Sequence, residues 1–311
     1  MLEVPRQNQS GCTKINVYIV TKPLQILIAK AIKDQLNPEC HSYLIVIDYF
    51  NNSKSVYENL KNEDWGYAGI YWASDKKNAI EYIRKIKAHS VFVDSDIGVR
   101  NLFFLARVKL VSVFPDIYVY EEGMGTYRTD LYSKKKSFFL RLFGVATHFG
   151  SSILTAGVFV YEPGRYLSLF PEYNKLCNKI KNNLISLIED KRLNLQAIFD
   201  DSDAAKKIER KSKECSVYLS SWSVDKTFLD NFQKIAGDKY VKLHPHIKIY
   251  TELGLKKGVQ QLPSSLPAEI ALLNLAKIYD RVAVYHHGSG VSLYLSSSVF
   301  DFKDIGHFNA L

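Results

Sequence analysis

The sequence predicts an α/β protein with two Rossmann-like domains that face each other across a cleft. Short apolar strands alternate with amphipathic helices from residue 15 to residue 128, which is typical of a parallel, doubly wound sheet. This rhythm breaks between residues 133 and 172, and a second α/β unit follows. Polar residues follow several strands, at the sheet edge where open α/β sheets bind ligands.

The first domain is expected over residues 1–160. Apolar runs rich in β-branched and aromatic residues predict its strands, at Ile15–Val20, Tyr43–Tyr49, Ser90–Val93 and Val111–Tyr120. Periodic apolar residues predict helices at Leu24–Leu36, Asn78–Ala88 and Asn101–Val108. Pro23 suits the first position of the first helix.

Crossover helices and a linker are expected over residues 161–213, and a second domain over 214–311. Tyr173–Phe199 has a long helical pattern, and Asp200–Lys213 is highly charged. The second domain should contain strands at Ser216–Ser220, Lys239–Leu243 and Arg281–Tyr285, and helices at Asp225–Ala236 and Pro267–Tyr279.

Composition limits the class of protein. The 311 residues are 47% apolar, which is ample for a core, and 41 Lys and Arg against 32 Asp and Glu give a net charge of +9. That sign favours an anionic partner. Four widely spaced cysteines (Cys12, Cys40, Cys177 and Cys215) suggest a reducing compartment. We expect no signal peptide and no membrane span, hence a soluble or peripheral protein.

Two adjacent carboxylates, Glu121 and Glu122, end the predicted strand Val111–Tyr120 and precede Gly123. Repulsion between them, or partial burial, could keep one basic enough to accept a proton. The alternative is a solvated turn with acidic residues near a helix N-terminus.

Further polar residues end strands of the second domain. His244 precedes Pro245, so its backbone is held extended, and its ring could donate to a phosphate or protonate a leaving oxygen. Gly288, Ser289 and Gly290 could present N–H and hydroxyl donors to a phosphate. A surface histidine and a plain glycine turn are the alternatives.

The start of the helix at Pro267 carries Ser264, Ser265 and Glu269. Ser265 could cap this helix, and Glu269 could bind ribose hydroxyls. His286 and His287 are adjacent on a strand and point to opposite faces, so we predict no metal site. No phosphate-binding P-loop or dinucleotide fingerprint occurs at a strand–helix junction, and no cofactor is predicted.

Taken together, these motifs resemble those of bacterial sialyltransferases that share a (D/E)(D/E)G motif, an HP motif and a downstream Ser/Thr motif. That group includes the lipooligosaccharide sialyltransferases and the capsule polysialyltransferases. The resemblance covers roughly residues 15 to 295. It rests on Thr21-x-Pro23-Leu24-Gln25, Glu121-Glu122-Gly123, His244-Pro245 and the serine motif near the end, in that order. Lipooligosaccharide-type sequences often have Thr-Pro directly, whereas Lys22 intervenes here.

The resemblance implies a GT-B fold and inverting, metal-independent transfer from a CMP-activated nonulosonic acid such as CMP-Neu5Ac. Glu122 would be the general base, supported by Glu121, and His244 would contact the donor phosphate as acid or electrostatic stabiliser. The donor-binding residues would be His244, Pro245, Ser264, Ser265, Glu269, Gly288 and Ser289. The acceptor side would include Gly123 and Arg128.

Two other classes stay open. One is a glycosyltransferase for another CMP-nonulosonate or another sugar nucleotide. The other is a basic nucleic-acid or membrane-binding module without catalysis, although no RNA-binding motif occurs and nucleic acid is not an expected partner.

A basic and aromatic segment at Ser133–Phe143, SKKKSFFLRLF, has two interpretations. It is either a core-facing helix of the first domain or a peripheral anchor for anionic lipid. An anchor would hold the enzyme at the inner face of the cytoplasmic membrane, next to a lipid-linked glycan acceptor.

Overall fold

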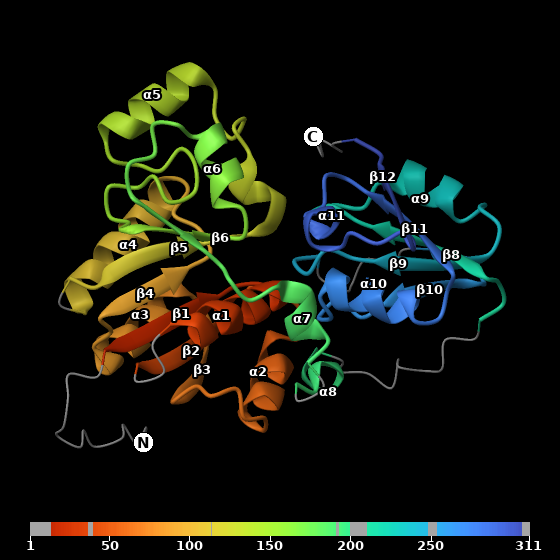
Figure 1. Cartoon of the computed structure of the whole chain (residues 1–311), viewed down its shortest axis with the longest axis horizontal. Helices are drawn as coiled ribbons and strands as arrows, with labels where there is room; N and C mark the ends of the chain where they lie inside the picture. The colour runs from red at the N-terminus through yellow and green to blue at the C-terminus, as the bar shows by residue number, and fades with distance from the viewer. Residues whose placement is uncertain are drawn as a thin grey trace.

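Two parallel sheets organise the protein, as the sequence predicts (Figure 1). The computed structural model describes residues 14–36, 40–112, 114–190, 193–199, 210–247 and 254–306. The first domain lies to the left in Figure 1 and the second, in cyan and blue, to the right. Both sheets carry helices on their two faces, so each domain is Rossmann-like, and the pair forms the two-domain arrangement called GT-B.

The first sheet has seven parallel strands in the order β3-β2-β1-β4-β5-β6-β7. Its strands are β1 (Ile15–Val20), β2 (His41–Ile47), β3 (Gly69–Ala73), β4 (Ser90–Val93), β5 (Asp116–Tyr120), β6 (Gly157–Val160) and β7 (Leu176–Lys179). The helices of this half are α1 (Pro23–Gln35), α2 (Ser53–Lys61), α3 (Lys76–Ile86), α4 (Val99–Val111), the 3-10 helix η1 (Gly123–Tyr127), α5 (Lys134–Leu142) and α6 (Pro163–Leu169).

The second sheet has five parallel strands in the order β10-β9-β8-β11-β12. Its strands are β8 (Glu214–Leu219), β9 (Asp238–Lys242), β10 (Val259–Leu262), β11 (Arg281–His286) and β12 (Phe300–Asp304). The short helices α7 (Leu184–Ile188) and α8 (Leu195–Phe199) connect the halves, and α9 (Lys226–Phe232), α10 (Ala268–Ala276) and α11 (Val291–Tyr294) belong to the second domain.

Strand periodicity distributes the core over the two faces of the first sheet. In β1, Tyr18 and Val20 pack into one cluster, while Val17 and Ile19 pack into the cluster on the opposite face, because successive strand side chains alternate. The first of these clusters also contains residues of α7, α8, β8 and α10. Apolar packing therefore continues from one domain into the other.

Two predicted elements are wrong. The strand expected over Val111–Tyr120 begins only at Asp116, because α4 continues to Val111 and Phe114 turns the chain with a φ of 56° before Pro115. The long helix expected over Tyr173–Phe199 is instead strand β7 followed by α7 and α8. The first sheet thus continues past residue 160, where the sequence predicts its domain to end. Most of Asp200–Lys213 lies outside the described residues.

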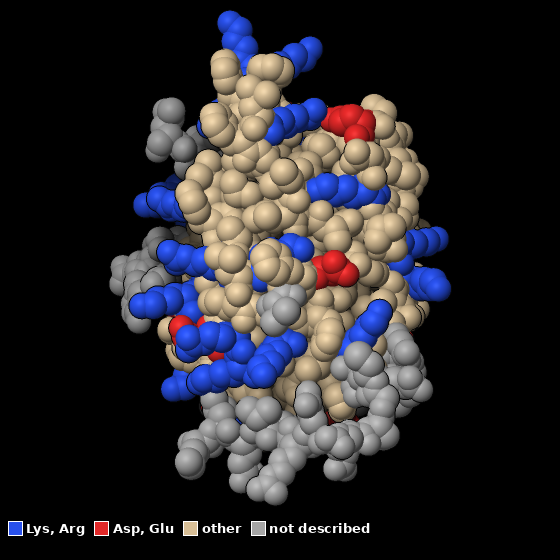
Figure 2. Space-filling view, turned by 90° about the vertical axis from the view of Figure 1, so that its left-hand side faces the viewer, with Lys and Arg blue, Asp and Glu red and all other residues tan. Residues whose placement is uncertain are grey.

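Helix α5 does not face the core. None of its residues is buried, and the exposed fractions of Phe138, Phe139, Leu142 and Phe143 are 62%, 62%, 65% and 76%. The core-facing interpretation of Ser133–Phe143 is therefore wrong. Helix α5 lies at the top of the first domain, where lysine and arginine side chains project from a largely uncharged surface (Figures 1 and 2). No helix within the described residues combines the length and the apolar character of a membrane span.

Candidate active site

A cavity of about 170 Å³ lies between the domains, at the carboxyl ends of both sheets. In each sheet the strand order changes direction at one point, between β1 and β4 and between β8 and β11, and open α/β sheets bind ligands at such points. The lining includes Lys22, Glu122 and Gly123 of the first domain and Lys242, His244, Pro245, Glu269, Ser289, Gly290 and Tyr294 of the second. The cavity therefore joins the predicted carboxylate to the predicted phosphate ligands.

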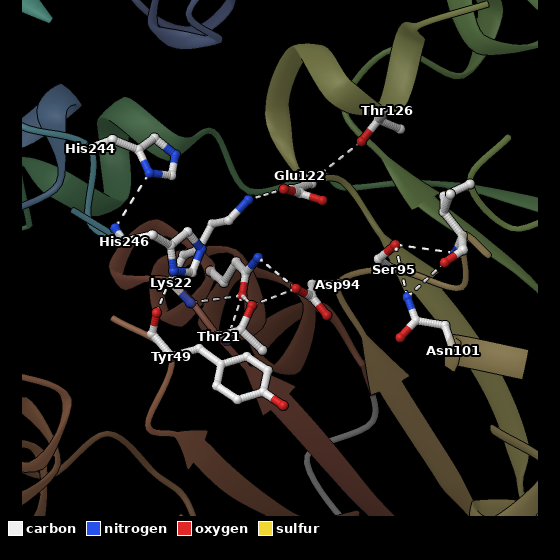
Figure 3. A network of polar contacts seen from close by, with 12 residues as sticks. Thr21, Lys22, Tyr49, Asp94, Ser95, Asn101, Glu122, Thr126, His244 and His246 are labelled. Atoms are coloured by element: carbon white, nitrogen blue, oxygen red, sulfur yellow. Dashed lines mark hydrogen bonds and ion pairs between the residues drawn. The ribbon is translucent and has the colours of Figure 1, made fainter. Parts of the chain in front are cut away.

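Of the two adjacent carboxylates, Glu122 is the one that faces this cavity, and its Oε1 is paired with Nζ of Lys22 (Figure 3). The backbone N–H of Glu122 donates to Oγ1 of Thr126 over 2.7 Å, which holds the turn after β5. Lys22 follows β1, and burial lowers the pKa of its ammonium. The predicted base thus has a cationic partner from the end of β1, which is separated from β5 by β4.

Glu121 points away from the cavity and is 1% exposed. Its carboxylate accepts hydrogen bonds from the hydroxyls of Tyr127 and Tyr294 and from the backbone N–H of Tyr161. Burial raises its pKa above the ordinary value. Because Tyr294 belongs to the second domain, Glu121 links the two domains across the cleft.

Strand β1 ends in a turn that fixes the backbone of Lys22 (Figure 3). Oε1 of Gln25 accepts from the N–H groups of Thr21 and Lys22, over 2.7 Å and 3.0 Å. The amide of Gln25 and the hydroxyl of Thr21 both donate to Asp94, at the end of β4. The Thr-x-Pro-Leu-Gln motif therefore has a structural role: it ties two strand ends together beneath the cavity.

His244 stands at the end of β9 as a neutral ring. Burial first, and then the nearby cations Lys22 and Lys242, lower its pKa to about 3. The backbone N–H of His246 donates to its Nδ1 over 3.4 Å, so the ring proton of neutral His244 is on Nε2, where it can donate to an anion. The exposed ring of Trp222 stacks on His244 with centroids 4.6 Å apart.

The loop after His244 is also anchored on the first domain. The N–H of Asn51 donates to the carbonyl of Pro245 over 3.1 Å, and Nδ1 of His246 bonds to the carbonyl of Tyr49. Pro245 lines the cavity, and its carbonyl also takes part in a contact between the domains.

Glu269 and Lys242 are buried ionisable side chains of the second domain that lie near enough to influence each other's pKa. Glu269 lies in the first turn of α10, and burial raises its pKa to about 7. Burial lowers the pKa of Lys242 to about 7, and Nζ donates to the carbonyls of Leu243 and Ser264. Both side chains face the cavity, so Glu269 is placed to meet a hydroxyl of a bound ligand.

The Gly288-Ser289-Gly290 turn contributes Ser289 and Gly290 to the cavity. Gly288, which was also predicted to donate to a phosphate, does not line the cavity. Its N–H donates to Oδ1 of Asp304 over 3.3 Å. Gly290 lies so close to the first domain that a Cβ on it would be 3.0 Å from the backbone nitrogen of Met124.

Three further predicted residues do not line the cavity. Ser265 does not cap α10, whose N-cap is Pro267, because its hydroxyl donates to the carbonyl of Phe199 over 2.7 Å. Ser264 is buried, and its hydroxyl has no partner among the described residues. Arg128 is outside the cavity and forms a bidentate ion pair with Asp130 at 2.8 and 2.9 Å.

Lys22, Lys242 and Tyr294 line the cavity although no motif marked them as site residues. The signal available for Lys22 was its position between the end of a strand and Pro23. Within the described part of the chain, no three His, Cys, Asp or Glu side chains are grouped to hold a metal ion.

Comparisons with known proteins identify no family for this chain. No protein-family model matches the chain, and no curated protein matches it. UDP-GlcNAc 2-epimerase of Neisseria meningitidis, solved bound to UDP-GlcNAc, is 11% identical, with a TM-score of 0.48 over 88% of this chain and 77% of that one. The ADP-heptose lipopolysaccharide heptosyltransferase II of E. coli is 10% identical, with a TM-score of 0.39 over 94% and 90%. At these TM-scores, the two sheets themselves are the stronger evidence for the fold.

Proposed function

We propose that this chain is an inverting, metal-independent sialyltransferase. It would move sialic acid from CMP-Neu5Ac to a hydroxyl of a cell-surface glycan, such as a lipooligosaccharide, an O-antigen or a capsule. One observation carries the proposal: Glu122 of the first domain and His244 and Ser289 of the second line a single cavity. Transfer from a nucleotide sugar to an alcohol requires a base for the alcohol and donors for the leaving phosphate, and the two domains supply one each.

In the proposed reaction, the first domain supplies the base and the second domain binds the CMP phosphate. The acceptor oxygen attacks the anomeric carbon as the bond from that carbon to the phosphate oxygen breaks, and the acceptor proton passes to Glu122. Negative charge develops on the CMP phosphate, where Nε2–H of His244 and the hydroxyl of Ser289 would donate. Glu269 would accept from a ribose hydroxyl. Closure of the domains would exclude water, which competes with the acceptor.

We further propose that the acceptor is lipid-linked and that α5 holds the enzyme at an anionic membrane surface inside the cell. Helix α5 combines exposed Phe138 and Phe139 with exposed Lys134, Lys135 and Lys136. Aromatic side chains enter the interface of a bilayer, and lysines meet anionic headgroups at about 1 kcal/mol each.

The function is tested by mixing the protein with CMP-Neu5Ac and a panel of glycan acceptors, and by identifying products with mass spectrometry and NMR. Parallel reactions contain other CMP-nonulosonates and UDP and ADP sugars. We expect a sialylated product with inverted anomeric configuration, and unchanged rates in EDTA. Transfer from a UDP or ADP sugar alone would overturn the donor assignment, and the absence of any transfer, with no nucleotide bound, would favour the non-catalytic alternative.

The base is tested with Glu122→Gln, which keeps the shape of the side chain but cannot take the proton. Transfer should fall by about 10²-fold or more, while CMP binding, measured by calorimetry, should not weaken. Glu58→Gln, on the exposed face of α2, is the matched control and should behave as wild type. Full activity of Glu122→Gln would place the base elsewhere.

A further inference from the structure

Lys22 contacts residues on both sides of the proposed site. Its Nζ pairs with Oε1 of Glu122, and the same ammonium lies 5.5 Å from the ring centre of Trp222 in the other domain. It is also near enough to His244 to depress the pKa of that ring. Figure 3 shows its side chain extended from the β1 turn toward Glu122.

The contact with Glu122 conflicts with the role proposed for that carboxylate. A carboxylate paired with an ammonium is a weaker base, because protonation would break the ion pair. A mechanism that uses Glu122 as base therefore needs Lys22 to have another anion to bind when the acceptor reacts.

Among the described residues that line the cavity, the other carboxylate is Glu269, which lies near Lys242, so a bound anionic ligand is the alternative partner for Lys22. Asp94, the carboxylate beyond the β1 turn, already accepts from Thr21 and Gln25. Lys242, the other lysine that lines the cavity in the described residues, donates to two backbone carbonyls and is held there. Lys22 is attached through a flexible stem and lines the same space as His244 and Ser289.

We propose that Lys22 is a donor-binding residue that exchanges one anion for another: it pairs with Glu122 in the empty cavity and with the phosphate of the nucleotide donor in the filled one. This inference rests on the proposed function, which supplies the nucleotide. Donor binding would thereby release Glu122, so that the base becomes competent only once there is a sugar to transfer.

The exchange predicts a phosphate-specific effect of Lys22 on binding. Calorimetry should compare CMP with cytidine, which lacks the phosphate, on wild type, Lys22→Met and Lys22→Arg. We expect Lys22→Met to bind CMP about tenfold or more weakly, since a charge-assisted contact is lost, and to bind cytidine as wild type does. Lys22→Arg should keep most of the preference for CMP. Lys54→Met is the matched control, because Lys54 also lies over a tryptophan ring, that of Trp72, but outside the cavity.

A double-mutant cycle tests the release of Glu122. Glu122→Gln frees Lys22 and should tighten CMP binding severalfold in the wild-type background, but not in the Lys22→Met background. An equal tightening in both backgrounds would mean simple repulsion between Glu122 and the phosphate, and would overturn the exchange. So would equal losses of CMP and cytidine binding in Lys22→Met.

The same binding experiments distinguish a wrong donor assignment from a wrong role for Lys22. If wild type binds no CMP but binds UMP or AMP, the CMP donor is wrong, and the same comparison of nucleotide with nucleoside still tests Lys22. If CMP binds and Lys22→Met changes nothing, the exchange is wrong and the donor assignment stands.

Discussion

Glu121 and Glu122 are neighbours in the chain but have different surroundings. Glu122 faces the cavity and Lys22, whereas Glu121 is buried beneath three donors, one of which is the hydroxyl of Tyr294 from the other domain. The reversal of side-chain direction at the end of a strand separates them. We therefore assign chemistry to Glu122 and the connection between the domains to Glu121.

A substitution of Glu121 should weaken the fold. In Glu121→Gln, an NH₂ group replaces one of the two accepting oxygens and faces a hydrogen-bond donor. A buried donor is then left without an acceptor, which costs about 1–3 kcal/mol of folding free energy. Urea unfolding followed by tryptophan fluorescence measures this cost. The control is Glu162→Gln, an exposed neighbour, which should cost less than about 0.5 kcal/mol.

The cost should also depend on pH. Burial raises the pKa of Glu121 above its ordinary value of 4.5, so the native protein binds more protons than the unfolded chain between those two pKa values. Wild type then loses stability as pH rises through that window, and the glutamine variant does not. The difference between them should shrink from acid to alkaline pH, and a difference that grew would contradict the assignment.

The sequence was informative about this site wherever a residue type and a strand end coincided. Glu122, His244 and Ser289 were predicted in this way, and all three line the cavity. Lys22 and Lys242 were not. Nothing local distinguishes Lys242 from a surface lysine, and the position of Lys22 between a strand end and Pro23 does not by itself indicate a site. Their positions follow from the meeting of two domains. The predicted capping role of Ser265 was wrong, because its hydroxyl donates to the carbonyl of Phe199, which is distant in the sequence.

At the scale of elements, the sequence was most reliable where the periodicity was strong. Strands β1 and β4 were predicted to the residue, and α1 to within one. The segment from Tyr173 to Phe199 was not, because β7 is a short edge strand with no alternating pattern, and α7 and α8 have five residues each. Packing against α1 and α2 stabilises those short helices, and the local sequence does not reveal this.

Helix α5 makes a prediction that belongs to the element. If it docks on anionic lipid, flotation should show binding to vesicles with phosphatidylserine or phosphatidylglycerol, and less at high salt. Changing Lys134, Lys135 and Lys136 to Glu should abolish that binding and leave transfer to a soluble acceptor unchanged. The same charge change at the exposed Lys256, Lys257 and Lys277 of the second domain is the control. Equal binding to neutral and anionic vesicles, or binding to neither, would rule out the anchor.

At the scale of the whole molecule, hydrogen bonds span the cleft on two sides of the cavity. Tyr294 donates to Glu121 over 2.7 Å, and the loop at Pro245 accepts from Asn51. The cavity between these contacts, about 170 Å³, is smaller than the ~300–1,000 Å³ usual for ligand pockets. Binding of the proposed nucleotide sugar would therefore be expected to displace the contacts that border this cavity.

The closest approach of the two backbones provides a test of the contacts across the cleft. Gly290 has helical backbone angles, φ −67° and ψ −10°, that any residue can adopt. An alanine at this position would therefore not strain the backbone of its own loop. Its Cβ would nevertheless stand 3.0 Å from the nitrogen of Met124 and 3.2 Å from Cα of Gly123, both in the first domain. The added methyl group acts only on the gap between the domains.

We expect Gly290→Ala to lower kcat/KM for transfer by about tenfold, because reacting groups on opposite walls are displaced by a few tenths of an ångström. Gly290→Val should lower it further, and the thermal midpoint of neither variant should fall by more than a few degrees. The matched control is Gly164→Ala, since a Cβ at Gly164 meets nothing within 4 Å. Wild-type kcat/KM in Gly290→Val would mean that the contact between Gly290 and Met124 is not part of the reactive state, and that transfer takes place with the domains further apart.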